Sequence, residues 1–173
     1  MFENIEIAME GLPRADTVDW QPLDPKYRGM QQTAVALLFG VIAIPLTVVS
    51  IFSKIPFWPA VALWVQWAII LVIALIWPII ALPKRGYVVR DKDLLFKKGV
   101  IWRSVTAVPF NRIQHVETSN TPLDRKFGLA TLQLFTAGGT GGDLKIEGLA
   151  ADVAEQLRVF ILEKAGSSIE RSE

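Results

Sequence analysis

Residues 29–53 read GMQQTAVALLFGVIAIPLTVVSIFS and contain no aspartate, glutamate, lysine or arginine. Residues 55–83 read IPFWPAVALWVQWAIILVIALIWPIIALP and contain none either, and Lys54 alone separates the two segments. A helix needs about 20 apolar residues to cross the roughly 30 Å hydrocarbon core of a bilayer. The sequence therefore predicts a transmembrane hairpin over residues 29–83, with helices at about 30–52 and 58–82.

The rest of the 173-residue chain has an ordinary mixed composition. Residues 84–165 are long enough for one small domain, and we expect 166–173 to be a disordered tail. The alternative, that the two apolar segments are core helices of a soluble protein, is disfavoured. The 90 residues from position 84 onward are too few to enclose two helices of this hydropathy.

The net charge of +1 conceals a partition along the chain. Residues 1–29 carry a net charge of −3, residues 84–126 carry +6, and residues 127–173 carry −3. Basic residues near helix ends mark the cytoplasmic side of a membrane protein. Because such residues flank both outer ends of the hairpin, we expect a protein that crosses the membrane more than once and has both termini in the cytoplasm.

Residues 1–28 form an acidic N-terminal segment that does not resemble a cleaved signal peptide, so we expect the first apolar helix to be retained. Phe2, Ile5, Met9 and Leu12 fall on one face of a short amphipathic helix. That helix either docks on protein or is a frayed terminus. Prolines then predict an extended linker over 13–28.

Three residues of the hairpin are candidate helix contacts. Pro45 and Pro78 interrupt the apolar runs, and they either bend the helices for packing or act as hinges. The spans hold no ionisable residue, which disfavours an ion or proton path. Gln66 is a mid-membrane amide, which we interpret as a hydrogen-bonding residue between helices or subunits.

From residue 87 the pattern changes to short β-rich runs separated by turns. We predict strands at 87–90, 94–99, 102–108, 116–119, 130–136 and 143–147, followed by an amphipathic helix that stops near Gly166. The predicted fold class is therefore an α+β membrane protein. Its helical hairpin precedes an antiparallel β-sandwich or open barrel, which is capped by the C-terminal helix.

The run VPFNRIQHVE at 108–117 and the block TPLDRKFGLATLQLFTAG at 121–138 carry a more specific signal. An Arg-Ile-Gln turn, an Arg-x-Phe-Gly-Leu turn and a strand ending in Thr-Ala-Gly occur in that order. Over residues 22–165 the chain resembles the YdbS-like family of bacterial pleckstrin-homology (PH) membrane proteins. The resemblance implies a PH-like domain at 84–165 behind two membrane helices, and a location in the bacterial inner membrane.

The two motif turns have structural and functional interpretations. Arg112 and Arg125 either bind phosphate headgroups or partner carboxylates, or tie their loops to backbone carbonyls. Gln114 is expected to satisfy turn backbone. Phe127 is expected to anchor its turn to the core, and Gly128 to adopt a backbone angle that other residues resist.

The sequence shows no enzymatic motif. It has no cysteine and one histidine, His115, which we interpret as a strand residue. The GGTGG run at 138–142 lacks the lysine and hydroxyl residue of a phosphate loop and is interpreted as a hairpin tip. We expect no catalysis, metal, cofactor, nucleic acid or small-molecule substrate.

Two functional hypotheses follow. In the first, the chain is a membrane-anchored assembly module that pairs with itself or with a PH-domain paralogue. The resemblance implies roles in envelope stress or antimicrobial tolerance. In the second, a basic face binds anionic lipid headgroups. Its candidate residues are Lys84, Arg85, Lys97, Lys98 and Arg103.

Overall fold

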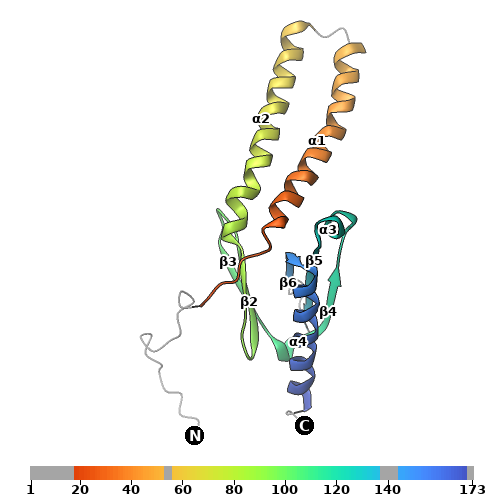
Figure 1. The fold of residues 1–173 in the computed structure, drawn as a ribbon. Helices are drawn as coiled ribbons and strands as arrows, with labels where there is room; N and C mark the ends of the chain where they lie inside the picture. Colours follow the sequence, from red (N-terminus) through yellow and green to blue (C-terminus); the bar gives the residue numbers. More distant parts are fainter. Residues whose placement is uncertain (1–17, 53–55, 137–143, 171–173) are drawn as a thin grey trace, which may run out of the picture.

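A computed structural model describes residues 18–52, 56–136 and 144–170 of the chain, and the side chains as far as residue 166. The predicted N-terminal amphipathic helix and the glycine-rich hairpin tip lie outside the described residues. The structure consists of a long helical hairpin that projects from one end of a small domain of strands and helices (Figure 1).

The hairpin is formed by α1 (Lys26–Phe52) and α2 (Phe57–Ala81). The most apolar windows of the two helices have mean hydropathies of 2.6 and 2.5, and only 0% and 11% of their residues are buried within the chain. The helices contact each other through an aromatic pair, Phe39 and Trp67, whose ring centroids are 5.8 Å apart. Their exposed apolar surface is what a bilayer would cover, so the length and hydropathy agree with the predicted hairpin.

The domain contains two three-stranded antiparallel sheets. The first has the order β1-β2-β3 and the second the order β4-β5-β6. The strands are β1 (Gly86–Val89), β2 (Asp93–Lys98), β3 (Ser104–Pro109), β4 (Ile113–Ser119), β5 (Leu129–Thr136) and β6 (Leu144–Ala150). The short 3-10 helices η3 (Leu82–Lys84) and η4 (Phe110–Arg112) connect elements, α3 (Pro122–Phe127) joins β4 to β5, and α4 (Ala151–Glu170) ends the domain.

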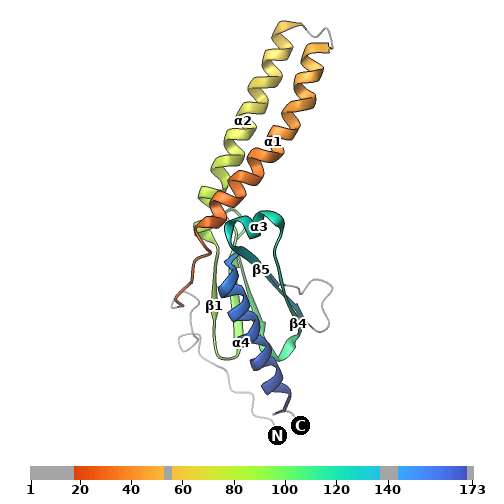
Figure 2. The same cartoon turned by 45° about the vertical axis from the view of Figure 1, so that its right-hand side comes forward.

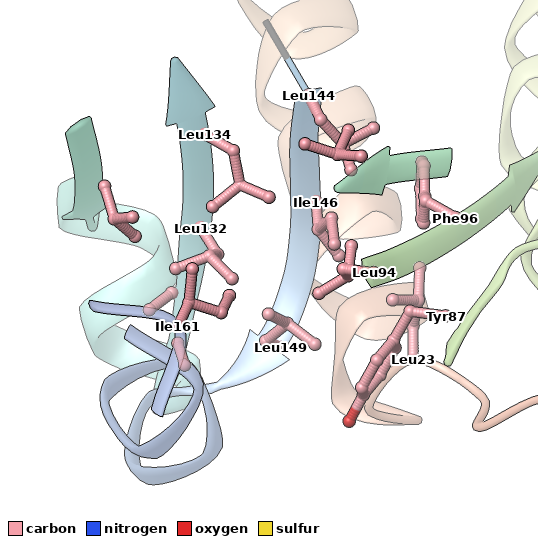
Figure 3. Packing of buried hydrophobic residues seen from close by; sticks show 14 of the residues in the cluster. Leu23, Tyr87, Leu94, Phe96, Leu132, Leu134, Leu144, Ile146, Leu149 and Ile161 are labelled. Carbon is pink, nitrogen blue, oxygen red and sulfur yellow. The ribbon is translucent and has the colours of Figure 1, made fainter. Parts of the chain in front are cut away.

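The core lies between the two sheets and is closed by α4. Figure 3 shows Leu94 and Phe96 of β2 facing Ile146 of β6, while Ile161 of α4 lies beside Leu132 of β5. Most of these side chains are fully buried. This arrangement confirms the predicted α+β fold class with a capping C-terminal helix.

The residues before α1 do not form a free linker. Gln21 forms a two-way backbone bridge with Tyr87 of β1, and the Asp24 amide donates to the Gly148 carbonyl of β6 at 3.0 Å. We call residues 18–25 the strap. Leu23 of the strap and Tyr27 at the start of α1 are buried in the core. The folded unit therefore reaches outside the predicted domain bounds of 84–165.

Several element bounds differ from the sequence predictions. Helix α1 begins at Lys26 rather than near residue 30, because Asp24 accepts a hydrogen bond from the Lys26 amide. Helix α4 continues through Gly166 to Glu170, where a disordered tail was predicted. Residues 122–127 form a helix rather than a turn. Trp102 lies in the turn before β3 and not in the strand.

We predict that Gly148→Ala destabilises the chain more than any glycine-to-alanine change in α4. Gly148 has a φ of 78°, and an added Cβ would lie 2.3 Å from the Tyr27 ring. The left-handed backbone and the clash together should cost about 1–3 kcal/mol of unfolding free energy. Thermal unfolding of the detergent-solubilised protein measures the loss.

The matched control is Gly166→Ala, because an added Cβ there meets nothing within 4 Å and alanine favours a helix. If the Gly148→Ala and Gly166→Ala variants unfold at the same temperature, the stability of the chain does not depend on the close packing of Tyr27 against Gly148.

Candidate functional site

The end of the domain that faces the helical hairpin is built from two separate elements. One is α3, which contacts the lower part of α1. The other is the turn of residues 99–103 between β2 and β3, which we call the β2–β3 tip. Figures 1 and 2 show both elements beside the base of the hairpin, and α4 running from that end toward the opposite one. This end is where the domain would meet a membrane surface.

A cavity of about 720 Å³ lies where the hairpin joins the domain. Its helix side is mostly apolar and includes Ala34 and Val35 of α1 and Ile73 of α2. Its domain side is mostly polar and includes Asp124 and Lys145. The lining therefore changes from apolar to polar from the predicted membrane span toward the domain.

The polar side is organised by hydrogen bonds around Glu147 of β6. The Tyr27 hydroxyl donates to Glu147 Oε2 at 2.8 Å, and Lys145 Nζ lies 2.9 Å from Glu147 Oε1. Burial alone would raise the pKa of Glu147, but the hydrogen bonds from Lys145 and Tyr27 outweigh it and hold the pKa below its usual value. The Glu147 carboxylate is therefore held in its charged form where α1 packs against the second sheet.

Four of the five predicted basic-face residues lie at the foot of α2. Arg85 and Lys98 line a second cavity of about 350 Å³ with Trp77 of α2 and Trp102 of the tip. Lys84 and Arg103 are exposed and directly adjoin Arg85 and Trp102 in the sequence. Lys97 differs, because its ammonium lies over the ring of Trp20 in the strap, 4.5 Å from the centroid. Lys97 therefore interacts with the strap of its own chain and does not line this cavity.

The structure does not bring the two motif turns together. Arg112 ends η4 and Gln114 lies at the start of β4, and both are exposed at the end of the domain away from the hairpin. Arg125 is exposed in α3, at the end near the hairpin. The seven residues of β4 separate the turns by about 20 Å at roughly 3.3 Å per residue, so they do not form one site.

The second motif turn has the backbone expected for it. Gly128 ends α3 with a φ of 69°, in the left-handed region, and its amide donates to carbonyls of Asp124 and Arg125. Phe127 is partly buried and packs against the core. These two residues therefore support the fold.

The three predicted helix contacts have different surroundings. Pro78 is buried and lines the large cavity, near the junction with the domain. Pro45 lies within α1 and Gln66 within α2, and both are exposed on the helical hairpin. Across the parts of the chain that the structure describes, the Gln66 amide makes no hydrogen bond.

Two parts of the site were missed by sequence reasoning. Tyr27 was assigned to a linker, and its partner Glu147 is 120 residues away in the sequence. Helix α3 begins with a capping box, in which Thr121 Oγ1 accepts from the Asp124 amide at 3.1 Å and Asp124 accepts from the Thr121 amide at 2.9 Å. The Thr-Pro-Leu-Asp spacing is the signal that could have revealed this helix.

Within residues 18–52, 56–136 and 144–170, no group of three or more histidine, cysteine, aspartate or glutamate residues is arranged to hold a metal ion. His115 is exposed on β4, and its Nε2 lies 2.9 Å from Glu117 Oε1. That pair joins two exposed side chains of one strand and does not border either cavity.

The fold and the comparison of sequences agree on the class of protein. The model of the bacterial PH domain family matches residues 32–165, which include most of the helical hairpin as well as the domain. The chain belongs to the bacterial PH domain family.

A particular relative is the UPF0699 transmembrane protein YdbS of Bacillus subtilis (strain 168). It is 28% identical to this chain over 130 residues, which are 75% of this chain and 80% of the relative. No solved structure matches the chain. The relative's description and the two apolar helices together support a membrane protein.

We predict that acid weakens the native chain partly through Glu147. A carboxyl whose pKa is lowered by folding stabilises the native state above its unfolded pKa, and this contribution is lost as the pH falls through the folded pKa. Glu147→Gln should therefore flatten the decline in unfolding temperature between about pH 5 and about pH 3. Thermal scans over that pH range measure the slope.

Glu163→Gln is the control, because it removes an exposed carboxylate from α4. Equal slopes in the Glu147→Gln variant and the unmodified protein would contradict a charged Glu147 bound to Lys145 and Tyr27.

Proposed function

We propose that this chain is a non-catalytic, membrane-anchored assembly module, which associates with a second copy or with another PH-domain membrane protein. The observation that carries the proposal is the exposed amide of Gln66 on an otherwise apolar helix. From the family resemblance we further propose that the assembly serves envelope stress or antimicrobial tolerance.

Gln66 lies nine residues after Phe57, or about 14 Å along the helix at 1.5 Å per residue. That is close to the middle of a hydrocarbon core of roughly 30 Å. An amide exposed to lipid at this depth has no water to bond with, and a helix from another chain would supply a partner.

The free edges of the sheets offer a second contact surface. The strap covers the edge of β1 and bonds to β6, but among the described residues the outer edges of β3 and β4 pair with no other strand. Ser104, Val105, Thr106 and Ala107 are all exposed on β3. Unpaired edges of this kind are templates for pairing with another chain.

The proposed topology places the domain in the cytoplasm, with both ends of the hairpin on that side of the inner membrane. Lys26 and Arg28 stand at the start of α1, and Lys84 and Arg85 follow α2. Basic residues close to the membrane favour the cytoplasmic side. The domain would then lie against the leaflet that carries the anionic lipids of the cell.

A second candidate function is the binding of anionic lipid headgroups. It is favoured by one observation, that Arg85 and Lys98 share a cavity with Trp77 near the end of the apolar span. Each basic residue close to an anionic surface contributes about 1 kcal/mol to attraction. Assembly ranks first because a domain already tethered by two helices gains little from this attraction.

We predict that Gln66→Leu weakens self-association. Interhelical hydrogen bonds in membranes contribute about 0.6–1.7 kcal/mol, so the dissociation constant should rise about 3- to 18-fold. Förster transfer between differently labelled chains in proteoliposomes, measured over a range of dilutions, gives the constant.

Thr47→Val is the matched control in α1. Thr47 is also exposed, but its hydroxyl already donates to the Ala43 carbonyl at 2.7 Å, so its loss should leave association unchanged. Association that is insensitive to Gln66→Leu, or chains that are monomeric at every dilution, would count against the proposal.

We predict that Val105→Lys also shifts the protein toward monomers, because a lysine on an edge strand opposes strand pairing. Val159→Lys on α4 is the control, since Val105 and Val159 are each 53% exposed and the two variants add the same charge. Chemical crosslinking in membranes measures the difference. An equal yield of crosslinked dimer in both variants would exclude β3 as an assembly edge.

A further inference from the structure

The β2–β3 tip presents two large apolar side chains to the outside. Trp102 is 85% exposed, the highest value among the exposed large hydrophobic residues of the described chain, and Ile101 is 71% exposed. Neither belongs to the core cluster. Apolar side chains of this size are seldom left in water together unless a surface covers them.

The strand register places the tip at the membrane end of the domain. Gly86, the first residue of β1, pairs with Lys97, and Lys98 pairs with Ser104 as the last pair of the hairpin. Residues 99–103 therefore extend beyond the level of Gly86, toward the end of α2. Figure 1 shows this hairpin rising beside the last turns of α2.

A cavity shared with α2 indicates the depth of the tip. Trp102 lines a cavity of about 350 Å³ together with Trp77 and Ala81 of α2. Trp77 lies in the last two turns of the apolar helix, where tryptophans of membrane proteins sit at the headgroup level. The apolar surface of the tip thus continues the apolar surface of α2.

The tip is held in shape by its own backbone. Gly99 has a φ of 111°, and a Cβ there would lie 1.8 Å from the Trp102 carbonyl oxygen. The two ends of the turn therefore lie close together, next to the strand pair of Lys98 and Ser104. The turn therefore presents Ile101 and Trp102 from a defined loop rather than from a free chain.

Basic residues border the apolar pair. Lys98 and Arg103 flank it in sequence, and Arg85 lines the same cavity. Long basic side chains beside exposed apolar residues are typical of segments that lie in a membrane interface, where the charged ends reach the phosphates.

We propose that Ile101 and Trp102 of the β2–β3 tip insert into the interface of the leaflet on the domain's side. This proposal requires that α2 crosses the bilayer, but it does not require that the chain associates with itself. The tip is covered by lipid rather than by a partner protein, because it adjoins α2, whose exposed surface is apolar. The insertion gives the domain a third attachment point besides α1 and α2.

The absence of cysteine from the sequence permits a direct test. Ile101→Cys, with Trp102 retained, takes one nitroxide label in the full chain, reconstituted in nanodiscs of phosphatidylcholine alone. We expect the label to be relaxed more by oxygen, which concentrates in lipid, than by a water-soluble nickel chelate. Val159→Cys on α4 is the control and should show the opposite preference, since Val159 is 53% exposed and α4 runs away from the hairpin (Figure 1).

Three outcomes would overturn the proposal. In the first, the label at residue 101 has the water-exposed preference of the label at 159. In the second, it is shielded from both reagents, which would mean that protein covers the tip. In the third, it is lipid-exposed only when phosphatidylglycerol is added, which would mean that headgroup charge rather than apolar insertion makes the contact.

A second variant separates insertion from mere proximity. Trp102→Ser combined with Ile101→Cys should raise the accessibility of the label to the nickel chelate, because the larger anchor has been removed. An unchanged depth in a protein with unchanged unfolding temperature would show that Trp102 does not hold the tip in the bilayer.

Discussion

The contact of Tyr27 with Gly148 links the two parts of the molecule. Tyr27 belongs to α1, but its ring packs against a glycine of β6 that has no room for a side chain, and its hydroxyl bonds to Glu147. Immediately before it, the strap bonds to both β1 and β6. The hairpin and the domain are therefore joined at α1 as well as through the direct connection from α2 to β1, and two joints restrict rotation more than one.

This double joint explains why features of the domain can be related to membrane depth. The β2–β3 tip and α3 are held beside the hairpin, whereas η4 and the end of α4 are held away from it (Figure 2). The polar side of the large cavity includes Asp124 of α3, and Arg85 and Lys98 share a cavity with Trp102 of the tip, so both groups lie at the hairpin end of the domain. If the domain were attached by a flexible linker, the same residues would have no fixed depth relative to the bilayer.

Much of the fold could be predicted because its signals are local. Absence of charge marks the helices, and alternation and turn residues mark the strands. The strap could not be recognised in this way, since Pro22 and Pro25 are typical of a linker and the partners of Gln21 and Asp24 lie more than 60 residues away. The assignment of Lys97 to a lipid face stays a prediction, but its contact with Trp20 could not be recognised for a similar reason. The charge of Lys97 is visible in the sequence, whereas its position over the Trp20 ring depends on the strap. The capping box of α3 was a local signal, and it was overlooked because the helix has only six residues.

The direction of the strands limits how two copies in one membrane can pair. Strand β3 begins near the base of α2 and runs away from the helical hairpin, whereas β4 runs back toward it (Figure 1). Two copies inserted the same way round can bring β3 against β3 only in a parallel arrangement, whereas β3 of one copy meets β4 of the other antiparallel. Antiparallel pairing is slightly more stable per residue. It is also head-to-tail, so the membrane plane would favour rings or rows of chains over an isolated two-fold dimer.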